Sequence, residues 1–370
     1  MILKIILLCC VPFLVIYFYH IFFFQRGLNK HPVRYNYQKP FVSIVIAARN
    51  EENSIRYLLL SLLNQTYPKE MYEVIVADDD STDSTSEVVK GFRDKFSNLK
   101  FITIKNRSQV KSPKKNALQQ AIAKSAGEIL LTTDADCIVG KNWISSHVLQ
   151  FEDDVMMSVG FSETRVNWEE AKLCQKYEHF DFLILFLAAA GAISGGKYYS
   201  CSGQNLAYRK EAFRKVGGFE SISHLVSGDD VNLMQLFRKS GFKIVFNFLP
   251  ENYTKTRMVK NCFQLLNQRS RWASNLKWQI ALNPAFFIYL ISVMVVLSFP
   301  LLMAFYSIVI AALFVLVRGI IEYKYVSNGF LVFGIRKKKL KFYPVWFILQ
   351  PIYILCVFFM GIMDIFSWKK

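Results

Sequence analysis

Two carboxylates stand one residue apart directly after an apolar run of the sequence. The run covers residues 128–133, and the carboxylates belong to Asp134 and Asp136 of the sequence Asp-Ala-Asp. Hard divalent cations such as Mg²⁺ or Mn²⁺ are bound through one or two carboxylates together with phosphate oxygens. This spacing therefore suits a metal that is clamped to a diphosphate. The alternative for so short a motif is a solvated turn or a helix cap.

A second acidic cluster, residues 78–80, closes another apolar run. A carboxylate such as that of Asp79 can accept a hydrogen bond from a nucleobase N–H group or from a ribose hydroxyl. The alternative is capping of the helix that follows, and both are compatible if Ser81 or Asp83 caps the helix while Asp79 binds a ligand.

A third acidic pair, Asp229 and Asp230, precedes a helical pattern of apolar residues at 233, 236 and 237. Two adjacent carboxylates raise one another's pKa, and a raised pKa suits a general base. N-capping of the helix is again the alternative interpretation. The pair is therefore a candidate for proton transfer.

The segment Gln268-Arg269-Ser270-Arg271-Trp272 precedes a long apolar run. The guanidinium group of Arg271 offers a bidentate fork for phosphate, and Trp272 offers a flat face for a sugar or an apolar chain. The alternative is a belt of basic and aromatic residues beside a membrane.

An alternation of strands and helices is expected to position these residues. Strands are predicted at residues 41–48, 73–77, 101–104 and 128–133, and helices at 54–63, from about 84 through 92, and at 116–126. Such alternation implies a mostly parallel α/β sheet with helices on both faces, in which ligands bind beyond the carboxyl ends of the strands. Two of those ends carry the acidic clusters at 78–80 and 134–136.

Three runs without a charged residue, 5–25, 278–317 and 342–363, predict the membrane-spanning segments. A bilayer core about 30 Å thick needs about 20 helical residues, so the outer runs span once and the middle run predicts a hairpin that turns near residues 298–300. We expect a transmembrane anchor at 1–25, uncleaved because its apolar stretch is longer than that of a signal peptide. A soluble domain at 40–277, a hairpin at 284–321, a basic loop at 322–342 and a last span at 343–366 are expected to follow. Residues 182–196 are apolar but too short to span, which predicts an interfacial or core helix ended by Gly191, Gly195 and Gly196.

The charge distribution predicts which side of the membrane the domain faces. The chain has 45 Lys and Arg against 28 Asp and Glu, a net charge of +17. Basic residues follow the first apolar run and fill the loop before the last one, and such residues stay on the cytoplasmic side. We therefore expect a multi-pass protein of the cell membrane whose domain faces the cytoplasm. Nucleic-acid binding is the alternative for so basic a chain, but no motif for it is present. Seven scattered cysteines fit a reducing compartment.

Taken together, these motifs resemble the family 2 glycosyltransferases, which are membrane enzymes with a GT-A nucleotide-sugar fold. The resemblance runs from residues 42–51 to Trp272 and includes 114–118, 203–209 and 217–219. It implies a GT-A domain, Rossmann-like with a mostly parallel sheet, between N-terminal and C-terminal transmembrane helices.

The resemblance also implies roles for single residues. Ala48, Asn50 and Glu51 would line the nucleotide pocket, Asp79 would bind the uracil or ribose, and Lys114 would lie near the diphosphate. Asp134 and Asp136 would hold the metal and the nucleotide-sugar, Asp230 would be the catalytic base beside Asp229, and Gln268, Arg271 and Trp272 match the family's Q-x-x-R-W motif. Asp80, Asn232 and Asn275 depart from the residues usual at these positions.

The expected function is inverting transfer of a sugar from a nucleotide-sugar, in particular a UDP-sugar, to a membrane lipid or a lipid-linked glycan, with Mg²⁺ or Mn²⁺ as cofactor. Two alternatives remain. One is a processive polysaccharide synthase of the cellulose, chitin or poly-N-acetylglucosamine type, which the Q-x-x-R-W motif favours and the small number of spans disfavours. The other is a catalytically inactive membrane scaffold, which the complete set of acidic residues disfavours. No Walker loop or G-x-G-x-x-G sequence is present, which argues against a nucleotide hydrolase or a dehydrogenase.

Overall fold

The chain folds into two compact units. The computed structural model describes residues 2–30, 34, 36, 38–105, 111–225 and 227–367. The helical unit consists of Met1–Lys30, Trp168–Tyr199 and Val259–Lys370, and the sheet unit consists of His31–Asn167 and Ser200–Met258. The soluble domain predicted at 40–277 is thus divided, because residues 168–199 and 259–277 pack with the apolar helices rather than with the sheet.

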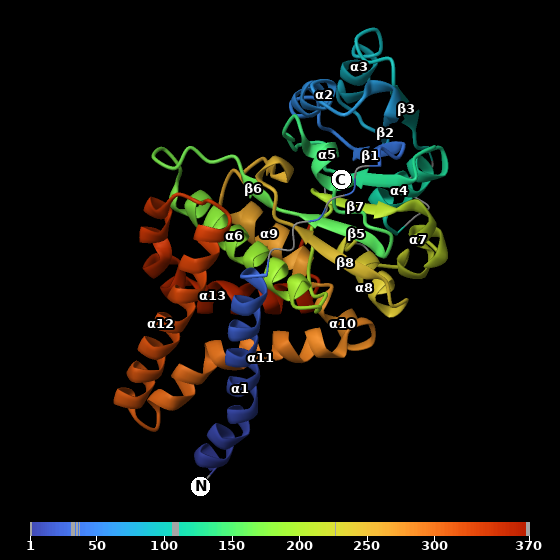
Figure 1. Cartoon of the computed structure of the whole chain (residues 1–370). Coiled ribbons are helices and arrows are strands. Elements are labelled where there is room, and N and C mark those ends of the chain that lie inside the picture. The colour runs from blue at the N-terminus through green and yellow to red at the C-terminus, as the bar shows by residue number, and fades with distance from the viewer. Residues whose placement is uncertain are drawn as a thin grey trace. The chain divides into compact units, whose positions relative to one another are not determined.

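The sheet unit is built on a seven-stranded sheet with the order β3-β2-β1-β4-β7-β5-β8 (Figure 1). Its strands are β1 (Val42–Ala48), β2 (Tyr72–Asp78), β3 (Leu99–Thr103), β4 (Ile129–Thr132), β5 (Val155–Gly160), β7 (Leu206–Arg209) and β8 (Lys243–Asn247). Neighbouring strands run parallel except on both sides of β7, which pairs antiparallel with β4 and with β5. The predicted mostly parallel α/β sheet is confirmed.

The four predicted strands are β1 to β4, and their pairing brings the acidic clusters to one edge. Ala48 at the end of β1 pairs with Asp78 at the end of β2, and Val45 pairs with Thr132 at the end of β4. Since these three strands are parallel, their carboxyl ends open at the same edge of the sheet. The clusters at 78–80 and 134–136 therefore lie on the same edge.

Helices cover both faces of this sheet. The helices are α2 (Ile55–Leu63), α3 (Thr85–Lys90), α4 (Pro113–Ala123), α5 (Trp143–Val148), α7 (Lys210–Lys215) and α8 (Val231–Lys239). Ile44 and Ile46 of β1 share one buried core with apolar residues of α2, α3 and α5. Side chains alternate along a strand, so Val45 faces the opposite side, where α4 packs on β1 and β2. Helix α4 begins three residues earlier than predicted, because Pro113 occupies its first turn, where a missing N–H costs nothing.

Three strands in the second half of this unit, β5, β7 and β8, were not predicted, and neither was a separate parallel pair, β6 (Ser162–Thr164) with β9 (Thr254–Thr256). These strands are between three and six residues long. In such short segments the alternation of apolar and polar residues does not repeat often enough to indicate a strand.

The helical unit contains α1 (Ile2–Leu28), α6 (Leu173–Ser194), α9 (Cys262–Ala273), α10 (Leu276–Leu282), α11 (Pro284–Ala304), α12 (Ile308–Val332) and α13 (Tyr343–Ile362). Among the described residues, four helical segments are long and apolar enough to cross a membrane: Leu3–Leu28, Leu173–Ser194, Pro284–Ala304 and Lys337–Ile362. Helices α11 and α12 are joined at residues 305–307 rather than at 298–300, and α12 is not among these four segments, so the membrane-spanning hairpin stays a prediction. Pro300 stays inside α11, and the Ser307 side chain caps α12 by accepting a hydrogen bond from the N–H of Ile310.

Residues 322–342, predicted as a basic loop, are mostly helical. Helix α12 continues to Val332, and a 3₁₀ helix, η5, covers Lys337–Phe342. Arg318 ended the uncharged run at residue 317, and Glu322 is the first residue of the predicted loop. The two residues lie one turn apart on α12 and form a buried ion pair, Arg318 Nε to Glu322 Oε1 at 2.6 Å. The hydroxyl of Tyr17 donates to the same oxygen at 2.6 Å. Pairing lets both charges remain inside the helical unit.

Helix α6 differs from the prediction in its start and in the role of a glycine. It runs from Leu173 to Ser194, beginning well before the apolar run at 182, and it is long enough to span a membrane. Gly191 does not end the helix but lies where α6 crosses α1. A Cβ atom added to Gly191 would lie 2.4 Å from the Phe24 carbonyl oxygen, and one added to Gly27 would lie 1.9 Å from the Gly191 carbonyl oxygen. The two backbones therefore touch without side chains between them.

Replacing Glu322 by Leu is expected to destabilise the helical unit by about 3–5 kcal/mol, because it leaves the Arg318 guanidinium buried without its carboxylate. Thermal unfolding of the purified chain in detergent measures the effect. The double variant Arg318→Met, Glu322→Leu removes both charges and is expected to recover most of the loss. Tyr17→Phe removes one hydrogen bond and should cost about 1 kcal/mol. An unchanged melting temperature for Glu322→Leu would contradict this account of the ion pair.

Candidate active site

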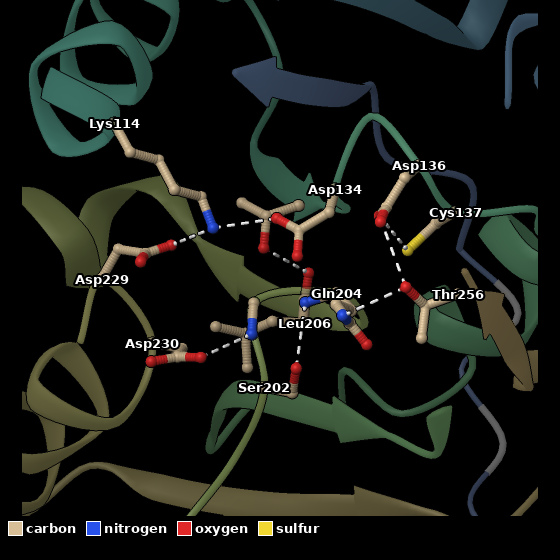
Figure 2. Close-up of polar contacts among 12 residues, drawn as sticks. Lys114, Asp134, Asp136, Cys137, Ser202, Gln204, Leu206, Asp229, Asp230 and Thr256 are labelled. Atoms are coloured by element: carbon tan, nitrogen blue, oxygen red, sulfur yellow. Dashed lines mark hydrogen bonds and ion pairs between the residues drawn. The ribbon is translucent and has the colours of Figure 1, made fainter. Parts of the chain in front are cut away.

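The ammonium group of Lys114 lies between two carboxylates at the acidic edge of the sheet (Figure 2). Its Nζ atom is 2.8 Å from Asp134 Oδ1 and 2.8 Å from Asp229 Oδ2. Lys114 comes from the first turn of α4, Asp134 follows β4, and Asp229 precedes α8. One cation thus joins three segments that are far apart in the sequence and brings two of the three predicted acidic clusters together.

The charges of this cluster push the pKa values of the two neighbouring aspartates apart. Burial raises the pKa of Asp229, but the positive charge of Lys114 outweighs it, so the pKa of Asp229 lies below its ordinary value. Burial and then the negative charge of Asp229 raise the pKa of Asp230. Burial lowers the pKa of Lys114, but Asp134 and Asp229 outweigh it and raise that pKa. Asp230 is therefore the carboxylate of the pair with the greater affinity for a proton.

Backbone N–H groups hold the carboxylate of Asp230 in place. Gly203 N donates to its Oδ2 at 2.9 Å, and Val231 N donates to its Oδ1 at 2.7 Å, so Asp230 is also the N-cap of α8. The capping interpretation and the site interpretation hold at once. Among the described residues each oxygen accepts one backbone hydrogen bond, so a lone pair remains on each for a further hydrogen bond.

The loop before this pair is held by Lys115, a residue to which the sequence analysis gave no role. Its buried ammonium group donates to the carbonyl oxygens of Ile222 at 2.9 Å, Leu225 at 2.5 Å and Ser227 at 3.0 Å. Burial lowers the pKa of Lys115 to about 8, although Asp229 and Asp230 oppose the shift. The two adjacent lysines of α4 thus have different roles, since Lys114 binds carboxylates and Lys115 binds backbone carbonyls.

The second carboxylate of the Asp-Ala-Asp motif has different neighbours. Thr256 Oγ1 donates to Asp136 Oδ1 at 3.4 Å, and the thiol of Cys137 lies 3.8 Å from the same oxygen. Burial, followed by the charges of Asp136 and Asp134, raises the pKa of Cys137 well above its ordinary value, so the thiol keeps its proton. Arg165 donates to the Asp136 carbonyl at 3.0 Å, which fixes the loop after β4.

The residues predicted to bind the nucleotide gather where β1 and β2 end. Ala48 is buried, and its carbonyl accepts from the N–H of Asp79 at 2.8 Å. Asn50 has a positive φ of 51°, which Asn tolerates, and its side chain accepts from Thr82 N at 2.9 Å. Asp79 is buried as well. Hydrogen bonds thus join the segments that follow β1 and β2.

Glu51 belongs to the same segment and lies close to a residue that the sequence analysis missed. Its backbone N–H donates to Thr85 Oγ1 at 2.8 Å, and its Oε2 atom is 3.6 Å from a guanidinium nitrogen of Arg257. Arg257 also donates to Ser54 Oγ at 3.1 Å. No signal in the sequence links positions about 200 residues apart, so this contact was not predictable.

Gln268, Arg271 and Trp272 of the Q-x-x-R-W segment all lie on α9, in the helical unit. All three side chains are partly exposed, whereas Arg269 between them is buried. The side chain of Trp272 contacts Phe182 of α6, with ring centroids 6.1 Å apart. The structure therefore assigns this motif and the acidic cluster to separate units.

Asn205 is the centre of a buried network of polar groups. The Asn205 Oδ1 atom accepts from Trp143 Nε1 and from His147 Nε2, each at 2.8 Å. Its amide nitrogen donates to the carbonyls of Phe161 at 2.7 Å and Asn252 at 2.8 Å. Asn205 lies in the segment 203–209, which resembles the family, but no role was predicted for it. Asn205 lies two residues after Gly203, so the network fixes the backbone that binds Asp230.

Comparison with known proteins identifies the class to which this fold and site belong. Residues 43–217 match the model of glycosyl transferase family 2, and residues 131–362, more than half of the chain, match glycosyl transferase family group 2. The chain belongs to the family 2 glycosyltransferases, and the resemblance derived from its motifs is confirmed.

Two curated relatives are similar in sequence. The probable glycosyltransferase YdaM of Bacillus subtilis is 28% identical over 269 residues, which cover 70% of this chain and 63% of YdaM. A beta-monoglucosyldiacylglycerol synthase of Nostoc sp. is 29% identical over 241 residues, which cover 63% of this chain and 48% of the synthase. The chain thus spans less than two thirds of the length of either relative.

A solved structure extends the likeness over the whole chain. The mannosyltransferase PcManGT of Pyrobaculum calidifontis, in complex with GDP-Man and Mn²⁺, superposes with a TM-score of 0.64 over 98% of both chains at 18% sequence identity. At this identity the likeness concerns the fold, and it confirms the GT-A class predicted for the sheet unit.

His147 is expected to make the stability of the sheet unit depend on pH. Burial lowers its pKa to about 4, whereas the unfolded chain has the ordinary value of 6.5. Between these values the unfolded state binds more protons, so stability is complete above about pH 6.5 and falls by about 3 kcal/mol as the pH decreases to about 4. Melting curves between pH 4.5 and 7.5 (about the range in which histidine titrates) measure this slope.

The variant His147→Asn should flatten that slope, because it removes the buried imidazole that takes up a proton on unfolding. A slope in His147→Asn equal to that of the unmodified chain would show that other groups cause the dependence.

Proposed function

We propose that this protein transfers a sugar from a nucleotide-sugar donor to a hydroxyl group of a membrane lipid or a lipid-linked glycan, with inversion at the anomeric carbon. The observation that carries the proposal is the array in which Lys114 bridges Asp134 and Asp229 while Asp230 keeps a raised pKa beside them. Such an array supplies a positive charge for a leaving diphosphate and a base for an attacking hydroxyl.

Asp230 is the proposed general base. Its carboxylate takes the proton of the acceptor hydroxyl while the acceptor oxygen forms a bond to the anomeric carbon. The bond between that carbon and the diphosphate oxygen breaks at the same time, and the nucleoside diphosphate leaves with the electron pair. Attack from the side opposite the leaving group inverts the configuration, so an α-linked donor gives a β-linked product. Lys114 neutralises the charge that grows on the diphosphate.

Asp134 and Asp136 are the proposed ligands of a divalent metal, Mg²⁺ or Mn²⁺. Two carboxylates fit a hard cation whose remaining ligands are phosphate oxygens and water. Among the described residues no group of three or more His, Cys, Asp or Glu side chains is arranged so that it could hold a metal ion by itself. When bound, such an ion would withdraw charge from the diphosphate. The complex of PcManGT with Mn²⁺ supports this assignment.

Ala48, Asn50, Glu51 and Asp79 are proposed to hold the nucleoside, since they share the ligand edge of the sheet with the acidic cluster. A UDP-sugar is the proposed donor. The structure of PcManGT contains GDP-Man, so the nucleobase of the donor has to be determined by experiment. A donor panel must therefore contain both UDP-sugars and GDP-sugars.

A lipid acceptor is proposed from the four helices that are long enough to span a membrane and from the diacylglycerol named in the Nostoc relative. The Q-x-x-R-W motif also occurs in processive synthases, which makes repeated transfer the second candidate. The number of sugars per product separates the two. We further propose that the sheet unit lies on the cytoplasmic side, where nucleotide-sugars are available.

Replacing Asp230 by Asn should reduce transfer by about 10²- to 10⁴-fold, because an amide cannot take the acceptor proton. The assay combines the full-length chain in detergent with UDP- and GDP-sugars, Mn²⁺ or Mg²⁺, and either diacylglycerol or a native lipid extract. It records nucleoside diphosphate release and the product mass. Asp154→Asn, at an exposed carboxylate paired with Lys243, is the matched control and should retain full activity.

Full activity in Asp230→Asn would remove the assignment of the base, and a product of retained configuration would exclude the single displacement. If the unmodified chain released no nucleoside diphosphate with any donor, the scaffold alternative would gain support.

The pH dependence of the reaction should respond to Lys114. The base acts when it is deprotonated, so kcat/KM should increase with pH through the pKa of Asp230. The charge of Lys114 lowers that pKa, and Lys114→Met should therefore shift the acid limb of the profile to higher pH, in addition to reducing the rate. Lys243→Met, at an exposed pair with Asp154, is the control for loss of a lysine. An acid limb that stays in place or moves to lower pH would contradict the assignment.

A further inference from the structure

Helix α9 carries the Q-x-x-R-W residues, and Arg269, which lies inside the motif but outside its defined positions, is buried. Arg269 lies between Gln268 and Arg271 and is only 5% exposed. A buried guanidinium keeps its five N–H donors and its charge away from water, which is costly unless it is paired. The partners of Arg269 therefore reveal its purpose.

The Arg269 guanidinium group lies over the ring of the motif tryptophan. Its central carbon lies 4.1 Å from the ring centroid of Trp272 and 5.4 Å from that of Phe182 on α6. Arg269 and Trp272 are three positions apart on one helix and so lie on the same side of it. A planar cation can stack on an indole face, which a lysine ammonium group does less well. Cation, indole and phenyl ring thus form one packed group.

This group is anchored by a carboxylate from another helix. Asp181 of α6 is buried, and its Oδ2 atom lies 3.4 Å from Arg269 Nε. Its other oxygen accepts from Trp346 Nε1 of α13 at 3.4 Å. Arg269 Nη1 in turn donates to Gln268 Oε1 at 3.2 Å. The guanidinium group is thus fixed by Asp181 and contacts two of the three motif side chains, one through a hydrogen bond and the other through its ring.

We infer that Arg269, held by Asp181, is a positioning residue that fixes the indole of Trp272 as a platform for the acceptor. The inference rests on the proposed function and on the prediction from the sequence that Trp272 offers a flat face for a sugar or an apolar chain. Trp272 is partly exposed, so part of its surface stays available while Arg269 and Phe182 cover another part. A ring held on one side binds a ligand on the other with less loss of side-chain freedom.

Fluorine NMR tests the positioning independently of turnover. The full-length chain in detergent is labelled with 5-fluorotryptophan at its six tryptophans, and Trp272→Phe identifies the resonance of Trp272. In Arg269→Met that resonance should shift and broaden, while the resonance of Trp143 in the sheet unit stays in place. Arg318→Met, which also removes a buried, paired arginine of the helical unit, is the matched control and should leave the Trp272 resonance unchanged.

Two further variants keep the test decisive if Arg269→Met does not fold. Asp181→Asn weakens the anchor while it keeps the guanidinium group, and Arg269→Lys keeps the charge while it loses the planar stack. Both should move the Trp272 resonance in the same direction, by less than Arg269→Met. A Trp272 resonance that is identical in the folded variants and in the unmodified chain would overturn the inference.

Kinetics test whether the positioning matters for the acceptor. With diacylglycerol as the probe acceptor, Arg269→Met should raise the acceptor KM by about tenfold, the loss expected for a desolvated cation–π contact, and leave the donor KM unchanged. In a Trp272→Leu background the same substitution should have no further effect on the acceptor KM. Additive effects of the two substitutions would show that Arg269 acts by another route and would overturn the inference.

The two proposals fail in different ways. If the unmodified chain shows no turnover but the Trp272 resonance depends on Arg269 and Asp181, the proposed function fails while the positioning of Trp272 stands. If turnover is found but neither the resonance nor the acceptor KM responds to Arg269, the proposed function stands and the positioning inference fails.

Discussion

Repulsion between carboxylates is the constraint on which the acidic edge of this protein depends. Asp134 and Asp229 come from segments 95 positions apart in the sequence, and two partly buried negative charges brought together without a cation would destabilise the fold. Lys114 resolves this by lying 2.8 Å from both. The same ammonium group holds the pKa of Asp229 low, and the charge that Asp229 keeps in turn raises the pKa of Asp230. One cation therefore fixes the geometry of the cluster and the order in which its acids titrate.

A second layer of contacts keeps that cluster rigid. Lys115 ties down the loop that leads to Asp229, and the network around Asn205 fixes the backbone at Gly203, whose N–H binds Asp230. None of these side chains belongs to an acidic motif. The precision of the site thus comes from buried polar groups that satisfy one another, as expected where unpaired polar groups would be costly.

The sequence was sufficient for the first half of the sheet unit and for the presence of the apolar helices, for a clear physical reason. Strands β1, β2 and β4 are short, mostly apolar runs, and acidic clusters follow β2 and β4, so local patterns in the sequence indicate these strands. The short strands after residue 150 lack a repeated pattern, and their order depends on pairing between distant segments. The prediction of a loop from residue 322 was wrong, because Arg318 and Glu322 neutralise each other inside the helical unit and do not mark its surface.

The same division holds for the site. Local motifs were sufficient to select Asp79, Asp134, Asp136 and Asp230, and the family resemblance added Lys114. The contact of Arg257 with Glu51 and the hydrogen bonds of Asn205 with His147 join residues from about 60 to about 200 positions apart, and only the folded chain shows them. A role for Arg269 was not predicted, because the Q-x-x-R-W motif is defined by Gln268, Arg271 and Trp272 and gives no role to the positions between them.

Helix α1 does more than anchor the chain, because it packs directly against α6 where the two helices cross at Gly27 and Gly191. Two helices whose backbones touch can neither rotate nor slide past each other without opening a gap or creating a clash. Helix α6 also carries Asp181, the anchor of Arg269. Deletion of α1 would therefore remove the helix that packs against α6, and α6 contacts the Q-x-x-R-W segment of α9 through Asp181. Biochemical work on this protein therefore calls for the intact chain.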